Sequence, residues 1–203
     1  MAGRLVTLEG PEGAGKTTQL RLLRQSLAAS DPLIVREPGD TALGERVREI
    51  LLHGDGEIGV EAEMYLFMAA RAELLEERIR PALQAGRLVL CDRYHDATRV
   101  YQGIVGGATV PWPPSFPRPA LTALLLVPPE VGRQRQAAEG KAPDRLEARP
   151  LAYHRRVADA YRSLAAQEPE RWIVLDGEQP PEQLCATLTA RIERVQQGTI
   201  GTP

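Results

Sequence analysis

Short apolar runs alternate along the chain with longer segments in which apolar residues recur at helical spacing. The short runs have the length and the aliphatic composition of buried strands, and they lie at Arg4–Glu9, Leu33–Arg36, 87–91, 121–127 and 172–175. The longer segments, which predict helices, lie at 41–52, 61–85, 129–139, 150–167 and 181–197. Strands that alternate with helices are typical of a parallel sheet covered on both faces. The pattern therefore predicts the α/β fold class.

Residues 103–119 fit neither pattern. Five prolines fall in this segment, at Pro111, Pro113, Pro114, Pro117 and Pro119. Because proline lacks a backbone N–H and clashes with the preceding helical turn, we expect an irregular connection here. Gly86 directly follows the helical segment before it, at the position where a glycine favours the end of a helix.

Composition and charge narrow the class of protein further. With 203 residues we expect one domain spanning 1–203. The 25 Lys and Arg residues against 27 Asp and Glu residues give a net charge of −2, so we expect no nucleic-acid partner. Two cysteines do not suggest a disulfide scaffold, and no apolar run is long enough to cross a membrane. Without a signal-peptide pattern before the first strand, we expect a cytoplasmic protein.

The run GPEGAGKTT at residues 10–18 carries the strongest functional signal. It fits the pattern G-x-x-x-x-G-K-[ST], in which glycines let consecutive N–H groups face a phosphate, a lysine adds charge and a hydroxyl reaches Mg²⁺. A strand precedes it, and Leu20, Leu23 and Leu27 follow at helical spacing, which makes a plain glycine turn the weaker interpretation. We predict an ATP-binding loop of Gly10, Pro11, Glu12, Gly13, Ala14, Gly15, Lys16, Thr17 and Thr18.

Charged residues follow two of the predicted strands. Arg36 ends one strand, and Asp92 and Arg93 follow another. Ligands in open parallel sheets bind at the carboxyl ends of strands, so these positions are either solvated loops or site residues. A carboxylate here can hold the water shell of a metal ion, and an arginine can bind a phosphate through both of its nitrogens.

The helix predicted at 61–85 has an arginine on its apolar stripe. Arg71 lies four residues after Phe67 and four before Leu75. A buried guanidinium needs a partner, which can be a structural carboxylate or a ligand. Two interpretations therefore remain open: a structural ion pair, or a pocket in which Phe67 stacks on a flat ring and Arg71 donates to its edge.

Histidine and cysteine give weaker signals. His53, His95 and His154 lack the spacing of metal ligands, and we expect no chemical role for them. Cys91 lies in an apolar strand, where a small core residue is expected rather than a nucleophile.

The segments GPEGAGKTT, REPG, FMAAR and DRY-T-VYQG, in this order and at these distances, resemble the bacterial thymidylate kinases. The resemblance runs from about residue 4 to residue 193. It implies a P-loop nucleoside-monophosphate-kinase fold, with a five-stranded parallel sheet wrapped by helices, a short mobile lid at about 136–149 and a homodimer. It also implies ATP as co-substrate, dTMP as acceptor and Mg²⁺ as cofactor.

The resemblance further implies roles for individual residues near the phosphates. Arg36 and Arg93 would clamp the phosphate of dTMP, and Glu12 would orient the acceptor. Thr17 and Asp92 would hold Mg²⁺, in part through water. Because phosphoryl transfer has a loose transition state, such residues act by positioning and by neutralising charge.

The same resemblance implies a nucleoside pocket. Phe67 would stack on thymine, Arg71 would reach its O4, and Thr98 would face the base edge. Tyr101 would lie against the sugar C2′, where a ribose hydroxyl would collide with it. Gln102, in the same YQG run, completes the implied dTMP-binding set.

Several positions depart from the family pattern. Asp40 stands where REPGG has its last glycine, Ala97 replaces a serine, and Val100 replaces an alanine. The segment 103–119 is about two helical turns short, which suggests that a family helix is lost. These changes leave the expected binding residues intact.

The lid departs from the pattern as well, because Glu139 stands where an arginine is expected to neutralise the transferred phosphoryl group. A cation must then come from another residue. We predict that Arg135 or Arg145 supplies it, with Lys141 as a possible helper.

Three functions remain in competition. The first is transfer of the ATP γ-phosphate to dTMP. The second is phosphorylation of another small acceptor, by a deoxynucleoside kinase or a different nucleoside-monophosphate kinase. The third is a catalytically weak nucleotide-binding module, which the altered lid favours. The intact pair Arg36 and Arg93 favours an acceptor that already carries a phosphate.

Overall fold

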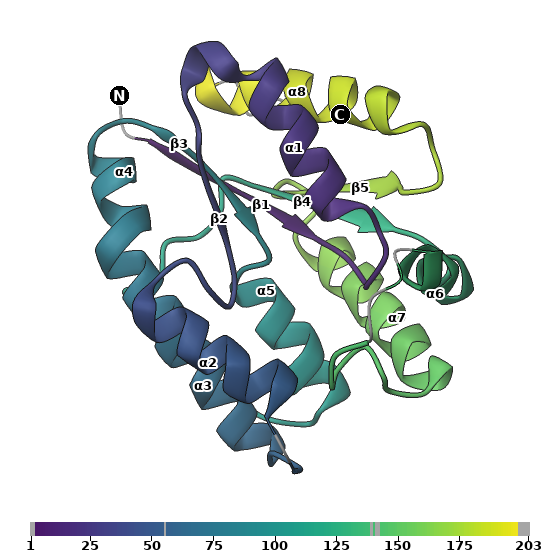
Figure 1. Cartoon of the computed structure of the whole chain (residues 1–203). Coiled ribbons are helices and arrows are strands. Elements are labelled where there is room, and N and C mark those ends of the chain that lie inside the picture. The colour runs from purple at the N-terminus through teal and green to yellow at the C-terminus, as the bar shows by residue number, and fades with distance from the viewer. Residues whose placement is uncertain (1–2, 55, 139, 141–142, 199–203) are drawn as a thin grey trace.

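Five parallel strands form a single sheet in the order β2-β3-β1-β4-β5 (Figure 1). The computed structural model describes residues 3–54, 56–138, 140 and 143–198 of the chain. The strands are β1 Arg4–Glu9, β2 Leu33–Arg36, β3 Leu88–Asp92, β4 Leu121–Leu126 and β5 Trp172–Asp176. All five predicted strands are present, with bounds shifted by at most one residue, and the predicted parallel sheet is confirmed.

Helices connect the strands. They are α1 Lys16–Ser26, α2 Ala42–His53, α3 Val60–Leu74, α4 Arg80–Gln84, α5 His95–Thr98, α6 Pro129–Ala138, α7 Leu151–Gln167 and α8 Pro181–Gln196. A π-helical turn, Leu75–Ile79, joins α3 to α4, so the long helix predicted at 61–85 is helical throughout but not uniform. Gly86 has a φ of 78° and its N–H donates to Leu83, as expected for a glycine that ends a helix.

One helical segment was not predicted from the sequence. Residues of α5 continue into a π-helical segment, Arg99–Val105, directly after the charged end of β3. Val100 and Val105 are buried there against Leu124 of β4 and Tyr161 of α7. This packing comes from distant parts of the chain, which explains why the local pattern did not reveal the helix.

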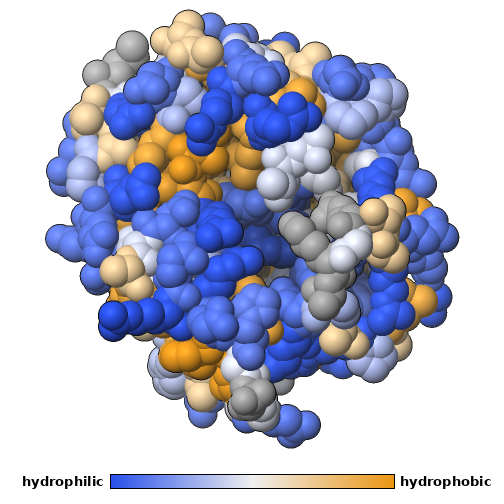
Figure 2. Space-filling view, in the orientation of Figure 1, coloured by the Kyte–Doolittle hydropathy of each residue, from blue (hydrophilic) through white to orange (hydrophobic). Residues whose placement is uncertain are grey.

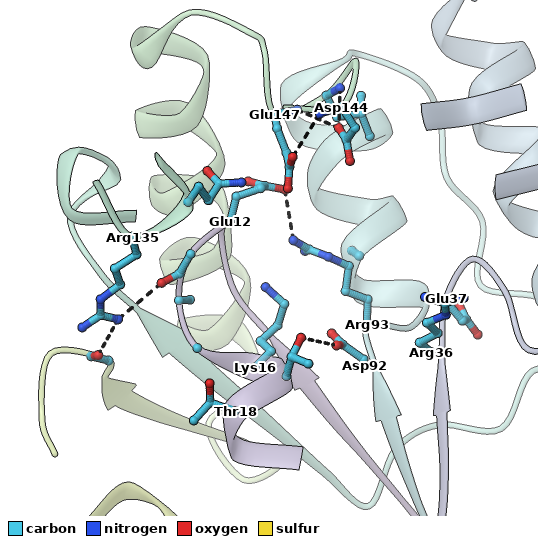
Figure 3. A pocket seen from close by; sticks show the side chains of 18 of the residues that line it. Glu12, Lys16, Thr18, Arg36, Glu37, Asp92, Arg93, Arg135, Asp144 and Glu147 are labelled. Carbon is cyan, nitrogen blue, oxygen red and sulfur yellow. Dashed lines mark hydrogen bonds and ion pairs between the residues drawn. The ribbon is translucent and has the colours of Figure 1, made fainter. Parts of the chain in front are cut away.

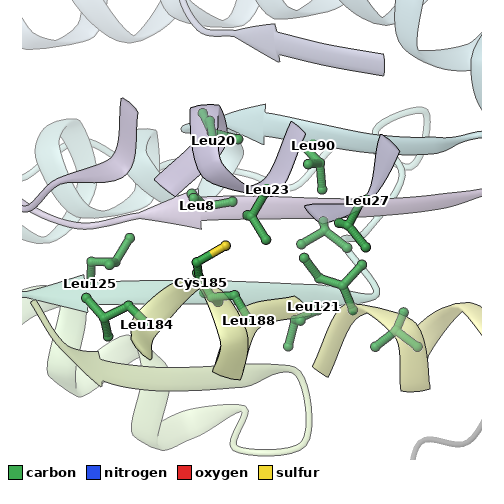
Figure 4. Packing of buried hydrophobic residues seen from close by; sticks show 14 of the residues in the cluster. Leu8, Leu20, Leu23, Leu27, Leu90, Leu121, Leu125, Leu184, Cys185 and Leu188 are labelled. Atoms are coloured by element: carbon green, nitrogen blue, oxygen red, sulfur yellow. The ribbon is translucent and has the colours of Figure 1, made fainter. Parts of the chain in front are cut away.

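Helices cover both faces of the sheet, and the strands divide their side chains between them. On one face, α1 and α8 pack leucines against the alternate strand residues Leu8 and Leu90 (Figure 4). On the other face, Leu5, Val89 and their neighbours pack against α3 and the π-helical turn after it. Burial on both faces fixes the sheet rigidly, so the carboxyl ends of β1, β2 and β3 form a stable base for a site.

The proline-rich connection is irregular, as expected. Residues 107–119 contain no helix. Trp112 and Phe116 of this segment pack against His95, and the centroid of the His95 ring lies 4.5 Å from that of Trp112 and 5.8 Å from that of Phe116. Trp112 Nε1 donates to the carbonyl of Phe116 at 2.8 Å. Two aromatic side chains thus pack in a segment that has no helix of its own.

Candidate active site

A cavity of about 1370 Å³ opens at the carboxyl ends of the strands. Figure 2 shows a hollow near the centre of this face, with hydrophilic residues along much of its rim. The cavity gathers most of the residues that the sequence singled out for both substrates: Glu12, Gly13, Ala14, Gly15, Lys16, Thr17, Thr18, Arg36, Phe67, Arg71, Asp92, Arg93, Thr98, Tyr101, Gln102 and Arg135. The predicted donor and acceptor sites are therefore two ends of one space.

The backbone of the phosphate loop requires glycine at two close approaches. A Cβ at Gly10 would lie 2.2 Å from the carbonyl oxygen of Leu125, and one at Gly13 would lie 2.3 Å from that of Gly132. Both residues also have positive φ angles, 142° and 70°, which L side chains rarely adopt. The loop ends at the amino terminus of α1, where free N–H groups and the helix dipole favour an anion.

Lys16 folds back over this loop. Its Nζ donates to the carbonyl oxygens of Gly10 and Pro11 at 3.0 and 2.9 Å. Burial and the nearby Arg93 guanidinium lower the pKa of Lys16 to about 8. Phosphate oxygens in the loop would favour the charged ammonium and provide it with stronger partners than carbonyls.

The Thr17 hydroxyl lies next to the carboxylate of Asp92, to which it donates at 3.4 Å. Both groups offer hard oxygen ligands, and Mg²⁺ bound with nucleotide phosphates takes few protein ligands and keeps several waters. No cluster of three or more His, Cys, Asp or Glu residues able to hold a metal exists within the described part of the chain. Thr17 and Asp92 thus fit a magnesium ion that phosphates and water help to coordinate, and not a cage made by the protein alone.

Arg93 lies between the two ends of the cavity. Its φ of 66° is unusual for a side chain of this size, and such strain is often found at functional sites. Its guanidinium donates to the Gly10 carbonyl at 2.9 Å and to the Tyr161 hydroxyl at 3.2 Å. It also donates to Glu12 Oε1 at 3.0 Å (Figure 3). Arg93 is therefore held in a fixed orientation beside the phosphate loop.

Glu12 receives several donors in this region. Tyr101 donates its hydroxyl to Glu12 Oε1 at 2.7 Å, next to the contact from Arg93. Burial alone would raise the pKa of Glu12, but Arg93, with help from His154 and Lys16, holds it well below the usual range. The loop therefore carries a fixed negative charge toward the acceptor end of the cavity.

Arg71 is 1% exposed in side-chain surface, and each of its three guanidinium nitrogens has a hydrogen-bond partner. Its Nε donates to Glu37 Oε2 at 2.6 Å, Nη2 donates to the Tyr94 carbonyl at 3.1 Å, and Nη1 lies 3.3 Å from His95 Nδ1. Burial raises the pKa of Glu37 to about 7 in spite of this ion pair. The structural ion pair that the sequence left open is present, and Arg71 also lines the cavity.

Other residues of the predicted nucleoside pocket lie in the same cavity as Arg71. Phe67 and Thr98 line the cavity, and the buried Thr98 hydroxyl has no hydrogen-bond partner within the described residues. A buried hydroxyl without a partner is costly, and a ligand group could provide one. Gln102 also lines the cavity, but its Nε2 donates to Glu63 at 2.7 Å.

Known proteins are similar to this chain across the residues that form the phosphate loop and the shared cavity. The family model described as thymidylate kinase matches residues 8–187. The chain belongs to the thymidylate kinase family. It is 46% identical over 201 residues to a thymidylate kinase of Thermomicrobium roseum, covering 95% of each chain. It is 45% identical over 199 residues to one of Deinococcus radiodurans, covering 94% of this chain and 96% of that one.

The fold agrees with this assignment. A crystal structure of thymidylate kinase from Ehrlichia chaffeensis superposes with a TM-score of 0.75 at 24% identity, covering 95% of this chain and 100% of that chain. The predicted P-loop fold with a five-stranded parallel sheet is thereby confirmed.

The departure from the family pattern at Asp40 has a structural basis. Asp40 has a φ of 61°, in the left-handed region that glycine favours and that aspartate tolerates better than most residues. Its Oδ2 accepts the Arg36 N–H at 2.8 Å, while the Arg36 side chain, 50% exposed, pairs with Glu45 at 2.9 Å. Aspartate thus preserves the turn that presents Arg36 to the cavity.

The structure separates the two arginines predicted as catalytic cations. Arg135 Nη1 donates to the carbonyls of Gly13 and Gly177 at 3.3 and 3.0 Å, which places it beside the phosphate loop (Figure 3). Arg145 lies elsewhere: it donates to the Leu51 carbonyl at 2.9 Å and to Glu63 at 2.5 Å. Glu139 and Lys141 lie outside the described residues.

Three residues that contact the predicted site were given no role from the sequence. Glu9 is fully buried, accepts from the Tyr94 N–H and the Tyr161 hydroxyl, and has a pKa raised to about 8 by burial and by Asp96. His95 contacts Arg71, and His154 Nδ1 lies 3.5 Å from Glu12 Oε2. One signal was available for His154, because it falls on the buried face of α7 with Val157 and Tyr161.

Proposed function

We propose that this chain transfers the γ-phosphoryl group of ATP to dTMP, giving dTDP and ADP. The observation that carries the proposal is the position of Arg93, which binds the phosphate loop through Gly10 and Glu12 and also lines the space shared with Phe67 and Arg71. A single guanidinium can therefore contact the phosphate of an acceptor that lies in line with a nucleotide in the loop.

Residues at different positions along the cavity would bind different parts of the two substrates. The loop N–H groups and Lys16 would bind the β- and γ-phosphates, and Arg36 with Arg93 would bind the acceptor phosphate. Thr17 and Asp92 would hold Mg²⁺, which supplies positive charge to the phosphate oxygens. Arg135, near Gly13, is our proposed in-cis cation for the charge that develops on the transferred group.

The assembly state and location are proposed separately. Leu43 and Ile50 of α2, Val60 and Tyr65 of α3, and Ile104 are large hydrophobic residues that remain exposed. Because α2 contacts α3, and Val60 contacts Gly106 close to Ile104, we propose that a second copy of this chain covers this face in a homodimer. Light scattering of the purified chain should give twice its 22.3 kDa mass.

No described helix has the length and apolarity to span a membrane. We propose separately that the protein is cytoplasmic.

One domain spanning 1–203, with a lid near 136–149, remains our proposal for the chain. Residues 143–148 lie beside the cavity, with Pro143, Asp144, Leu146, Glu147 and Ala148 among its lining residues. This position is where a lid over the donor nucleotide would be useful.

An ADP-release assay over a panel of acceptors tests the function. We expect dTMP to be the best substrate, ahead of dUMP by about tenfold, because one methyl group in an apolar pocket is worth roughly 1–3 kcal/mol. The panel should also include thymidine, TMP with a ribose sugar, AMP and GMP. Preference for thymidine or a purine monophosphate would favour another kinase, and ATP binding without turnover on any acceptor would favour a nucleotide-binding module.

A further inference from the structure

His154, in the first turn of α7, occupies a position between two acceptor groups. Its side chain is 6% exposed. Ring nitrogen Nε2 lies 3.2 Å from the carbonyl oxygen of Glu147 and 3.1 Å from that of Arg149. Ring nitrogen Nδ1 lies 3.5 Å from Glu12 Oε2 on the opposite side. The imidazole thus bridges the phosphate loop and the turn that leads into α7.

Glu12 needs the contact on its second oxygen. Arg93 and Tyr101 both bond to Oε1, whereas Oε2 is buried and makes no hydrogen bond of good geometry within the described residues. The ion-pair contact with His154 is what faces this oxygen. An unpartnered buried carboxylate oxygen is costly, so a cationic donor at this point stabilises the orientation of Glu12.

The surroundings of the ring decide its charge. A neutral imidazole has one N–H, yet acceptors face both nitrogens, and only the imidazolium donates to both. Arg93, which pairs with Glu12, and Arg149, with its guanidinium carbon 4.7 Å from the Tyr153 ring centroid, are cations next to the groups that contact this ring. Tyr153 and Tyr101 are the neighbouring phenols. The contact with the Glu12 carboxylate outweighs burial and raises the pKa of His154 above its ordinary value.

We propose that His154, as an imidazolium, is a positioning residue that ties the Glu12 carboxylate to the backbone of residues 147–149. It acts through Glu12, which together with Arg93 faces the acceptor phosphate, so the inference rests on the proposed function. Glu12 with both oxygens held presents one orientation to the acceptor. Loss of the imidazolium should lower kcat more than it raises KM.

Two amide replacements separate the two sides of the ring. His154→Asn places its amide near the position of Nδ1 and can still donate to Glu12, whereas His154→Gln reaches the carbonyls of Glu147 and Arg149 instead. We expect kcat to fall about tenfold in His154→Gln, the effect of losing one charge-assisted hydrogen bond, and less in His154→Asn. KM for dTMP should stay within about twofold. Arg162→Gln, at an exposed position on the same helix, is the matched control and should match the wild type.

The pH dependence gives a readout that a purely structural role would not change. Because the charged form is the active one, kcat should fall as pH rises through the raised pKa of His154, above its usual value of about 6.5. This alkaline decline should be absent from both amide variants, while any decline that remains belongs to Lys16 or the substrates. Identical kcat profiles for His154→Gln and the wild type would overturn the proposal, as would equal losses in both variants that follow their melting temperatures.

A direct titration keeps the test independent of turnover. In the wild-type protein, NMR of the ring nitrogens should show His154 protonated above pH 6.5, and Glu12→Gln should lower its pKa. A pKa below the ordinary value in the wild type would refute the inference even if dTMP is phosphorylated. If the wild type fails to phosphorylate dTMP but titrates as expected, the proposed function fails and the contact between His154 and Glu12 stands.

Discussion

The phosphate loop and the predicted nucleoside pocket share one cavity but are built in different ways. The loop consists of consecutive residues between β1 and α1, and its shape follows from backbone approaches that only glycine permits, as at Gly10 and Gly13. The pocket is assembled from α3, the end of β3 and the helical segment after it, and buried side-chain bonds such as Arg71 to Glu37 hold it together.

This difference predicts how the two regions respond to substitution. Side chains of the loop that point at phosphates contribute little to the fold, so replacing them should affect turnover and ATP binding but leave the stability of the fold almost unchanged. The buried side chains of the pocket both line the site and satisfy each other, so replacing them should affect binding and stability together.

The sharpest contrast should come from Lys16→Ala. Among the described residues, Lys16 hydrogen-bonds to the loop carbonyls of Gly10 and Pro11, and it is the loop side chain proposed to bind the β- and γ-phosphates. We expect kcat to fall by at least about 10²–10³, with weaker ATP binding and an almost unchanged melting temperature. Steady-state kinetics and thermal unfolding measure both, with Arg21→Ala at an exposed position of α1 as the control. Near-normal turnover in Lys16→Ala would refute the assignment of the loop.

Arg135 and Arg145 test whether the contrast extends to the cations near the lid. Arg135 contacts two carbonyls beside the loop, so Arg135→Ala should lower kcat by about 10³ with KM nearly unchanged, and stability should be largely kept. Arg145→Ala would leave Glu63, 4% exposed, without its closest cation, and should cost about 3 kcal/mol of unfolding free energy with kcat kept. If neither variant changes kcat by more than a few-fold, neither arginine is the catalytic cation.

The sequence predicted those parts of the site whose geometry is local. The loop, the strand ends and the arginine on the apolar stripe of α3 are patterns within one element, and the fold follows from the alternation of such elements. Contacts between distant residues could not be predicted in this way. Arg145 and Glu63 lie 82 positions apart, and their ion pair removes Arg145 from the loop. His154 was assigned no role because its partner, Glu12, comes from the other end of the chain.

Arg71→Ala should affect binding and stability in one variant. It removes the cation from buried Glu37, so we expect the free energy of unfolding to fall by about 3–5 kcal/mol. Loss of a donor to the base should also raise KM for dTMP by roughly tenfold or more. The double variant Arg71→Ala/Glu37→Gln separates the effects, because a neutral amide relieves the buried charge and should recover much of the stability but not KM. Recovery of KM as well would reduce Arg71 to a structural role.

Tyr101 offers the smallest and most selective test, because its ring and its hydroxyl serve different ends of the cavity. The hydroxyl donates to Glu12, and the ring is predicted to exclude a ribose 2′-hydroxyl. Tyr101→Phe should therefore lower kcat a few-fold, the effect of losing one hydrogen bond, and keep the preference for deoxyribose. Tyr101→Ala should lose that preference as well, measured as the ratio of kcat/KM for dTMP and its ribose counterpart. If Tyr101→Ala keeps the preference for deoxyribose, the ring does not select the sugar, and the role left for Tyr101 is the hydrogen bond from its hydroxyl to Glu12.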